Sequence, residues 1–161
     1  MNRIMSLMTA IAVMAVWSGC ASTPSLPRGF VANLAGVEEV PPLKTTAYGR
    51  ATFHRDGDQL RYKLMVYNIQ DVTMANLHIG HVGENGDHIA WLYPPQPPEK
   101  LIKGRFSGCL IQGTLTAADL IGPMKGQTIA DLVHKMKSRD IYVNVHTQQF
   151  PEGEIRGQVH Q

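Results

Sequence analysis

Four of the seven histidines lie where strand and loop patterns can bring their imidazole rings together. His78 lies in an alternating stretch, and His81 and His88 lie in or beside the Gly-rich segment that follows it. His146 belongs to a second alternating stretch near the C-terminus. Imidazole nitrogens are common ligands of Cu and Zn in proteins. The pattern predicts a copper or zinc site from His78, His146 and either His81 or His88.

Strand alternation decides which side chains share a face with these histidines. Residues 75–79 and 141–147 each place every second residue in the core, as a half-buried strand does. The opposite face then carries Asn76 and His78 from the first stretch, and Tyr142, Asn144 and His146 from the second. A structural alternative is that His78 and His146 hydrogen-bond nearby loops, because polar groups under a loop are normally satisfied in this way.

Other polar residues indicate structure more than chemistry. Glu154 and Arg156 are two residues apart on one predicted strand face, which predicts an ion pair or hydrogen bonds from Arg156 to loop carbonyls. The sequence lacks the nucleophile elbow, the phosphate-binding loop, the dinucleotide fingerprint and the His-Glu-x-x-His motif. It therefore favours a protein that is not an enzyme.

The elements that position these residues are mostly short strands. Alternation and turn residues predict strands at 30–34, 47–54, 59–68, 74–79, 89–93, 105–116, 141–147 and 154–160. Gly113 is expected to mark a bulge, Thr116 to cap one helical turn, and residues 128–137 to form the one good helix. About eight strands with one short helix predict an all-β, antiparallel Greek-key sandwich or barrel.

The N-terminus is typical of an exported lipoprotein. Residues 1–19 combine Arg3 with an apolar stretch too short for a comfortable membrane span. Trp17-Ser18-Gly19-Cys20 resembles the bacterial lipobox, in which the cysteine carries the lipid. We expect lipidation at Cys20, a tether over residues 20–29, and an outer-membrane lipoprotein of the cell envelope that faces the periplasm or the cell surface. Cys109 then has no disulfide partner and is expected to be a buried free thiol.

Composition excludes several classes of protein. The 161 residues carry a net charge of only +2, which does not suit a nucleic-acid-binding protein. Two cysteines exclude a disulfide scaffold and a cysteine-rich zinc site. The length suits one domain, here residues 30–161.

Several motifs, in order along the chain, resemble those of the CHRD domain, a module found in chordin and in bacterial extracytoplasmic proteins. They are Phe30-Val31-Ala32-Asn33-Leu34, Glu38-Glu39-Val40-Pro41-Pro42, Ala75-Asn76-Leu77-His78-Ile79-Gly80, Tyr142-Val143-Asn144-Val145-His146-Thr147 and Gly153-Glu154-Ile155-Arg156-Gly157-Gln158. The resemblance implies an immunoglobulin-like or superoxide-dismutase-like β-sandwich. The family often has histidine where this chain has Asn76.

Two hypotheses for function follow. The first is a lipid-anchored, non-enzymatic CHRD-domain protein that binds or scaffolds an envelope protein or polysaccharide. The alternative is a periplasmic copper- or zinc-binding protein that uses its outward histidines. Superoxide dismutase holds its metal with imidazoles on the outside of a β-barrel, but that comparison is an analogy of fold alone.

Overall fold

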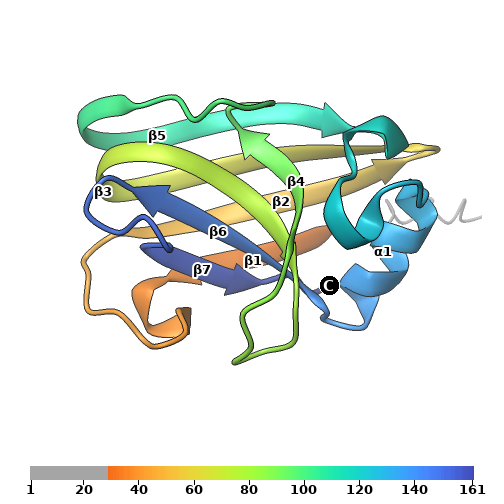
Figure 1. The fold of residues 1–161 in the computed structure, drawn as a ribbon, viewed down its shortest axis with the longest axis horizontal. Coiled ribbons are helices and arrows are strands. Elements are labelled where there is room, and N and C mark those ends of the chain that lie inside the picture. Colours follow the sequence, from red (N-terminus) through yellow and green to blue (C-terminus); the bar gives the residue numbers. More distant parts are fainter. Residues whose placement is uncertain (1–28) are drawn as a thin grey trace, which may run out of the picture.

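The computed structural model describes residues 29–161, which form seven strands and one α-helix (Figure 1). The strands are β1 (Phe30–Ala35), β2 (Tyr48–Asp56), β3 (Gln59–Ile79), β4 (His88–Tyr93), β5 (Ile102–Leu115), β6 (Ile141–Thr147) and β7 (Ile155–Gln158). The helix is α1 (Ile129–Lys137), and three short 3-10 turns cover Gly36–Glu38, Ala117–Asp119 and Gly122–Met124. The predicted signal peptide, Cys20 and nearly all of the tether lie outside the described residues.

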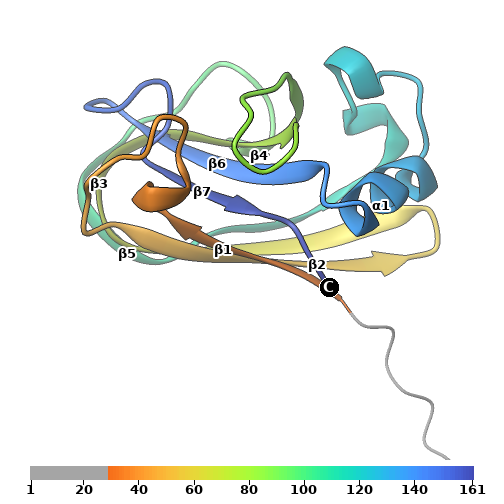
Figure 2. The same cartoon turned by 90° about the horizontal axis from the view of Figure 1, so that it is seen from below.

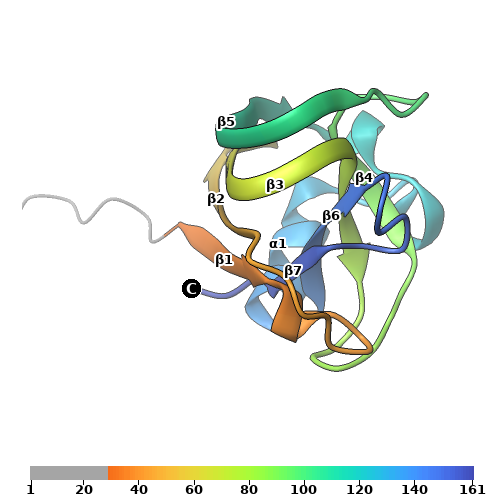
Figure 3. The ribbon, with the colours of Figure 1, turned by 90° about the vertical axis from the view of Figure 1, so that its left-hand side faces the viewer.

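The sheet curls until it meets itself (Figure 3). The strand order is β2-β1-β7-β6-β3-β4, and β2 also pairs with β3, which closes a ring of five strands. The first part of β3 additionally pairs with β5, and its last part pairs with β4 and β6. Every pairing is antiparallel. The predicted all-β sandwich or barrel with one short helix is confirmed.

The long strand β3 corrects the expected strand count. Residues 59–68 and 74–79 were predicted as separate strands, but they belong to one strand of 21 residues. Asn68 and Asp71 have left-handed φ values of 54° and 53°, and register shifts flank both residues. These polar residues resemble a loop in the sequence. In the structure they are irregularities that bend a continuous strand from one part of the sheet into the other.

Two expectations for β5 were wrong. Gly113 is not a bulge, because it pairs in register with Tyr62, and a Cβ at Gly113 would lie 2.8 Å from the Tyr62 hydroxyl. Glycine is required there for this close approach. Cys109 is a free thiol but is exposed rather than buried. Its strand lies at an edge of the sheet, paired only with β3, and Cys109 falls on the outward side of the alternation.

The helix lies at one end of the sandwich, beside the 3-10 turns Ala117–Asp119 and Gly122–Met124 (Figure 1). Thr128 caps it and forms a reciprocal capping box with Asp131. Its buried side chains are Ile129, Leu132, Val133 and Met136, the face predicted from their spacing. Among residues 29–161 no helix is both long and apolar enough to cross a membrane.

Candidate functional site

The predicted outward face of β3 and β6 lies beneath loops. Residues 36–47, 80–87 and 148–154 form three covering loops on one side of the sheet (Figure 2). Asn76, Asn144 and His146 are therefore only 2%, 4% and 5% exposed. We call this polar surface of β3, β4, β6 and β7 the loop-covered face. Alternation assigns the residues of this face, but it cannot show that loops will bury them.

Three histidines from three strands meet on the loop-covered face. His78 of β3 pairs across the sheet with His88 of β4, and their ring centroids are 5.6 Å apart. His146 of β6 leans toward His78, with 6.1 Å between centroids. The Nε2 atoms of His78, His88 and His146 are all buried and have no hydrogen-bond partner. Unpartnered buried polar atoms are rare in proteins, so three in one cluster require an explanation.

The Nδ1 atoms of two of these rings are bound to the covering loops. Nδ1 of His78 lies 3.0 Å from the carbonyl oxygen of Gly86, and Nδ1 of His146 lies 2.9 Å from that of Pro151. A carbonyl only accepts hydrogen bonds, so each Nδ1 carries the proton and each Nε2 presents a lone pair. Each of these two histidines can therefore hydrogen-bond a loop through Nδ1 and still bind a metal ion through Nε2. A metal-bound histidine commonly donates its other N–H to a backbone carbonyl.

Burial keeps this trio uncharged. It lowers the pKa of His78 to about 4, against a smaller raising effect of the Gly86 carbonyl. Burial also lowers the pKa values of His88 and His146. At neutral pH the rings are neutral imidazoles, which is the form that binds metal ions.

The rings must move to share one ion. Three imidazoles bound to one zinc ion at about 2.1 Å have centroids roughly 5 Å apart, which is closer than the separations found here. Accordingly, no group of three or more His, Cys, Asp or Glu side chains within residues 29–161 is arranged to hold a metal ion. Metal binding would require ring rotations that draw the three Nε2 atoms together.

The structure separates His81 from the other three histidines. Its side chain is 70% exposed, and its Nδ1 lies 2.8 Å from Asp140, an aspartate that also contacts Lys135. His81 therefore belongs to a surface polar group with Asp140 and not to the buried trio. Because Gly80 separates His81 from the strand pattern, the sequence does not indicate where the His81 side chain points. In the structure it points outward.

Asn76 adds a fourth unpartnered acceptor to the loop-covered face. It lies on β3 two positions before His78 and is opposite Trp91 and Asn144. Its amide nitrogen is 3.4 Å from the sulfur of Met74, while its Oδ1 is buried without a partner. An amide oxygen is a weaker ligand than imidazole for Cu or Zn, but it can complete a coordination shell.

Arg156 and Glu154 have structural roles on the same face. Arg156 donates to the carbonyl oxygens of His81 and Glu84 and to Oδ1 of Asn85, and its guanidinium stacks 3.5 Å from the Tyr142 ring centroid. These contacts hold the 80–87 loop. Of the two roles that the sequence suggested for Arg156, an ion pair or hydrogen bonds to loop carbonyls, the structure has the hydrogen bonds. No ion pair joins it to Glu154 within the described residues.

Glu39 and its pocket were not predicted. Glu39 is only 7% exposed, its Oε1 has no partner, and Asn144 Nδ2 lies 3.4 Å from its Oε2. Burial raises its pKa to about 7, although the positive charge of Arg156 and the Asn144 hydrogen bond oppose this rise. The Glu-Glu-Val-Pro-Pro segment contains two prolines, which donate no backbone hydrogen bond and so do not suit the middle of a sheet. Nothing in that pattern shows that the second glutamate turns inward.

Together these features define a closed all-β domain whose polar face is sealed by three loops and contains a histidine trio. The chain belongs to the CHRD domain family, whose model matches residues 30–159. No curated protein and no solved structure matches the chain.

Proposed function

We propose that this CHRD protein is a lipid-anchored, non-enzymatic binding protein of the bacterial cell envelope, and that its ligand is a copper or zinc ion held by His78, His88 and His146. The observation that carries the proposal is the set of three buried Nε2 atoms without partners. A buried polar atom without a partner costs about 1–3 kcal/mol, and a metal ion would satisfy all three atoms at once.

The surroundings of the trio favour retention of an ion over turnover of a substrate. The rings come from three different strands, and loop carbonyls accept the Nδ1–H of two of them, which leaves their Nε2 lone pairs for an ion. All three Nε2 atoms are shielded from solvent, whereas a catalytic metal site keeps an open position. Asn76 Oδ1 is a candidate fourth ligand, because it is buried and unpartnered on the same face.

The first test measures the metal content of the full chain and then titrates the chain with copper and zinc. The protein is purified in mild detergent with an affinity tag that contains no histidine. We expect near-stoichiometric copper or zinc by mass spectrometry, with affinity lost in histidine variants. Asparagine is the sharpest replacement, because its amide N–H can replace the Nδ1–H donor but it offers nothing at Nε2. His78→Asn and His146→Asn should each lower affinity by more than about a hundredfold, beyond the usual effect of losing an outer-shell partner.

His81→Asn is the matched control, since His81 is exposed and bound to Asp140. It should leave metal affinity unchanged. A chain that takes up neither copper nor zinc at micromolar concentrations would contradict the metal proposal. The other candidate ligands, an envelope protein or a polysaccharide, would then be tested instead.

The anchor has its own test, with the second cysteine as its control. The support for lipidation is the lipobox-like segment that ends at Cys20, placed shortly before the first strand of the domain. In cells labelled with a palmitate analogue, Cys20→Ser should abolish label and membrane association. Cys109→Ser should retain both, because Cys109 is a surface thiol on β5. Label that persists in Cys20→Ser would contradict the anchor.

A further inference from the structure

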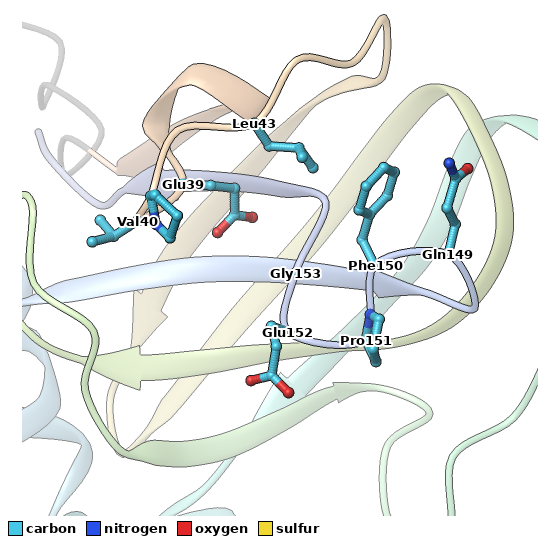
Figure 4. A pocket seen from close by; sticks show the side chains of 9 residues that line it. Glu39, Val40, Leu43, Gln149, Phe150, Pro151, Glu152 and Gly153 are labelled. Carbon is cyan, nitrogen blue, oxygen red and sulfur yellow. The ribbon is translucent and has the colours of Figure 1, made fainter.

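A second site lies between two of the covering loops (Figure 4). A pocket of about 240 Å³ opens between the 36–47 and 148–154 loops. Its lining residues are Glu39, Val40, Pro41, Leu43, Gln149, Phe150, Pro151, Glu152 and Gly153. Figure 4 shows the Glu39 carboxyl group directed into the space between the two loops. The pocket thus combines mostly apolar walls with one buried acidic group.

Glu39, which lines the pocket, has an acceptor without a donor, and so does Asn144 beside it. Oε1 of Glu39 has no partner, and neither has Oδ1 of Asn144, whose amide nitrogen approaches Glu39 Oε2 and the carbonyl oxygen of Glu152 at 3.4 Å each. Asn144 also lies directly against Gly153, where a Cβ would collide with its amide group. A ligand that satisfies this site must therefore bring N–H or O–H donors.

The charge balance favours a cation. Arg156 is the positive group that acts on Glu39, but its guanidinium is occupied by the 80–87 loop and the Tyr142 ring. No salt bridge reaches Glu39 among the described residues. Glu152 at the rim adds a second carboxylate. A buried carboxylate without a paired cation is unfavourable, so a bound positive charge would stabilise it.

The apolar part of the lining limits what can carry that charge. Val40, Pro41 and Leu43 lie on one loop, and Phe150 and Pro151 on the other. We propose that this pocket binds a primary ammonium group carried on a short apolar stem. Ammonium has three donors, one of which would satisfy Glu39 Oε1. An alkyl- or arylalkylammonium ion and an exposed lysine side chain share this chemistry. The proposal does not depend on the metal proposal.

The test compares charged and neutral probes of the same shape. The full chain would be titrated in mild detergent with benzylammonium chloride, benzyl alcohol and N-acetyl-lysine methylamide at pH 8. Nuclear magnetic resonance would follow backbone amides of residues 38–43 and 149–153. We expect saturable shifts with the ammonium probes and at least tenfold weaker binding of benzyl alcohol, because a charge-assisted hydrogen bond is worth about 1.5–3 kcal/mol. The stronger ammonium probe indicates which stem the walls prefer.

Two variants locate the effect. Glu39→Gln keeps the shape of the side chain and removes its charge, so it should weaken ammonium binding at least about tenfold while the circular dichroism spectrum is unchanged. Glu152→Gln is the matched control at the exposed rim and should change affinity by less than about threefold, since exposed charge pairs contribute little. Equal binding of benzyl alcohol, unchanged affinity in Glu39→Gln, or no saturable shift with either ammonium probe would each overturn the proposal.

Discussion

Glu154 and Glu39 are equally buried, each 7% exposed, but their carboxylates differ in how many hydrogen bonds they receive. Glu154 accepts hydrogen bonds from the hydroxyls of Thr45 and Thr147, at 2.7 and 2.9 Å, so both carboxylate oxygens are satisfied. Glu39 has one long contact to Asn144 and a free Oε1. Glu154 therefore belongs to a satisfied set of polar residues on the loop-covered face, and Glu39 belongs to an unsatisfied set on the same face.

The same contrast holds across the wider face. Near Arg156, the loop carbonyls, Asn85 and the Tyr142 ring satisfy the guanidinium. Near His78, each ring of the trio keeps a buried nitrogen without a partner. Native proteins satisfy most buried polar groups, and unsatisfied ones concentrate where a ligand binds or strain is held. The satisfied set, Glu154 and Arg156, helps to hold the loops in place, and the unsatisfied set, Glu39 and the histidine trio, is where ligands are expected.

Removing Arg156 should give the largest effect, because Arg156 belongs to the satisfied set. Arg156→Ala removes the side-chain donor of the Glu84 carbonyl and one of two donors of the His81 carbonyl, which keeps the Glu84 backbone N–H, and it takes a buried cation from its partners. We expect a loss of about 3–5 kcal/mol in the free energy of unfolding, measured by urea denaturation. Arg50→Ala, at an exposed position on β2, should cost less than about 0.5 kcal/mol. A cost below about 1 kcal/mol for Arg156→Ala would show that the loops do not depend on it.

The pH dependence of the metal-free protein should show two opposing contributions from the unsatisfied set, one from His78 and one from Glu39. His78 has a pKa of about 4 when folded against an ordinary value of 6.5, so the unfolded chain takes up a proton that the folded chain does not. Its contribution to stability is therefore lost as the pH falls from about 6.5 toward 4. Glu39 has a pKa of about 7 when folded against 4.5, so its contribution is lost as the pH rises from about 4.5 through 7.

Variants should separate these two contributions. In the parent, the Glu39 contribution to the free energy of unfolding decreases between pH 4.5 and 7. Glu39→Gln removes this decrease, so the stability of the variant should rise with pH more steeply than that of the parent. His78→Asn should shift the slope in the opposite direction. Each difference should reach about 2–3 kcal/mol across the window, at about 1.4 kcal/mol for each pKa unit and allowing for partial exposure. Urea midpoints measured every half unit of pH would test this, and profiles parallel to the parent would contradict both assignments.

The sequence predicts the two sets of residues unequally. Period-2 alternation placed Asn76, His78, Asn144 and His146 on one face, and capping and spacing located α1, because these signals are local. The convergence of His88 with His78 and His146 depends on the pairing of β4 with β3, which no local pattern specifies. The inward turn of Glu39 depends on loops that close over the face, and the single bent strand β3 depends on partners at both ends. Such features follow from contacts between residues far apart in the chain.

The smallest effect comes from changing the two carboxyls themselves, and it bears most directly on the contrast between them. Glu154→Gln removes one of two acceptors that receive hydroxyl donors and places an amide N–H₂ against a threonine oxygen. We expect a cost of about 1–2 kcal/mol at pH 8. Glu39→Gln at the same pH removes a buried charge with no paired cation, so the protein should be unchanged or about 1 kcal/mol more stable. Urea denaturation of both variants beside the parent measures the difference, and equal costs would mean that both carboxylates are satisfied to the same degree.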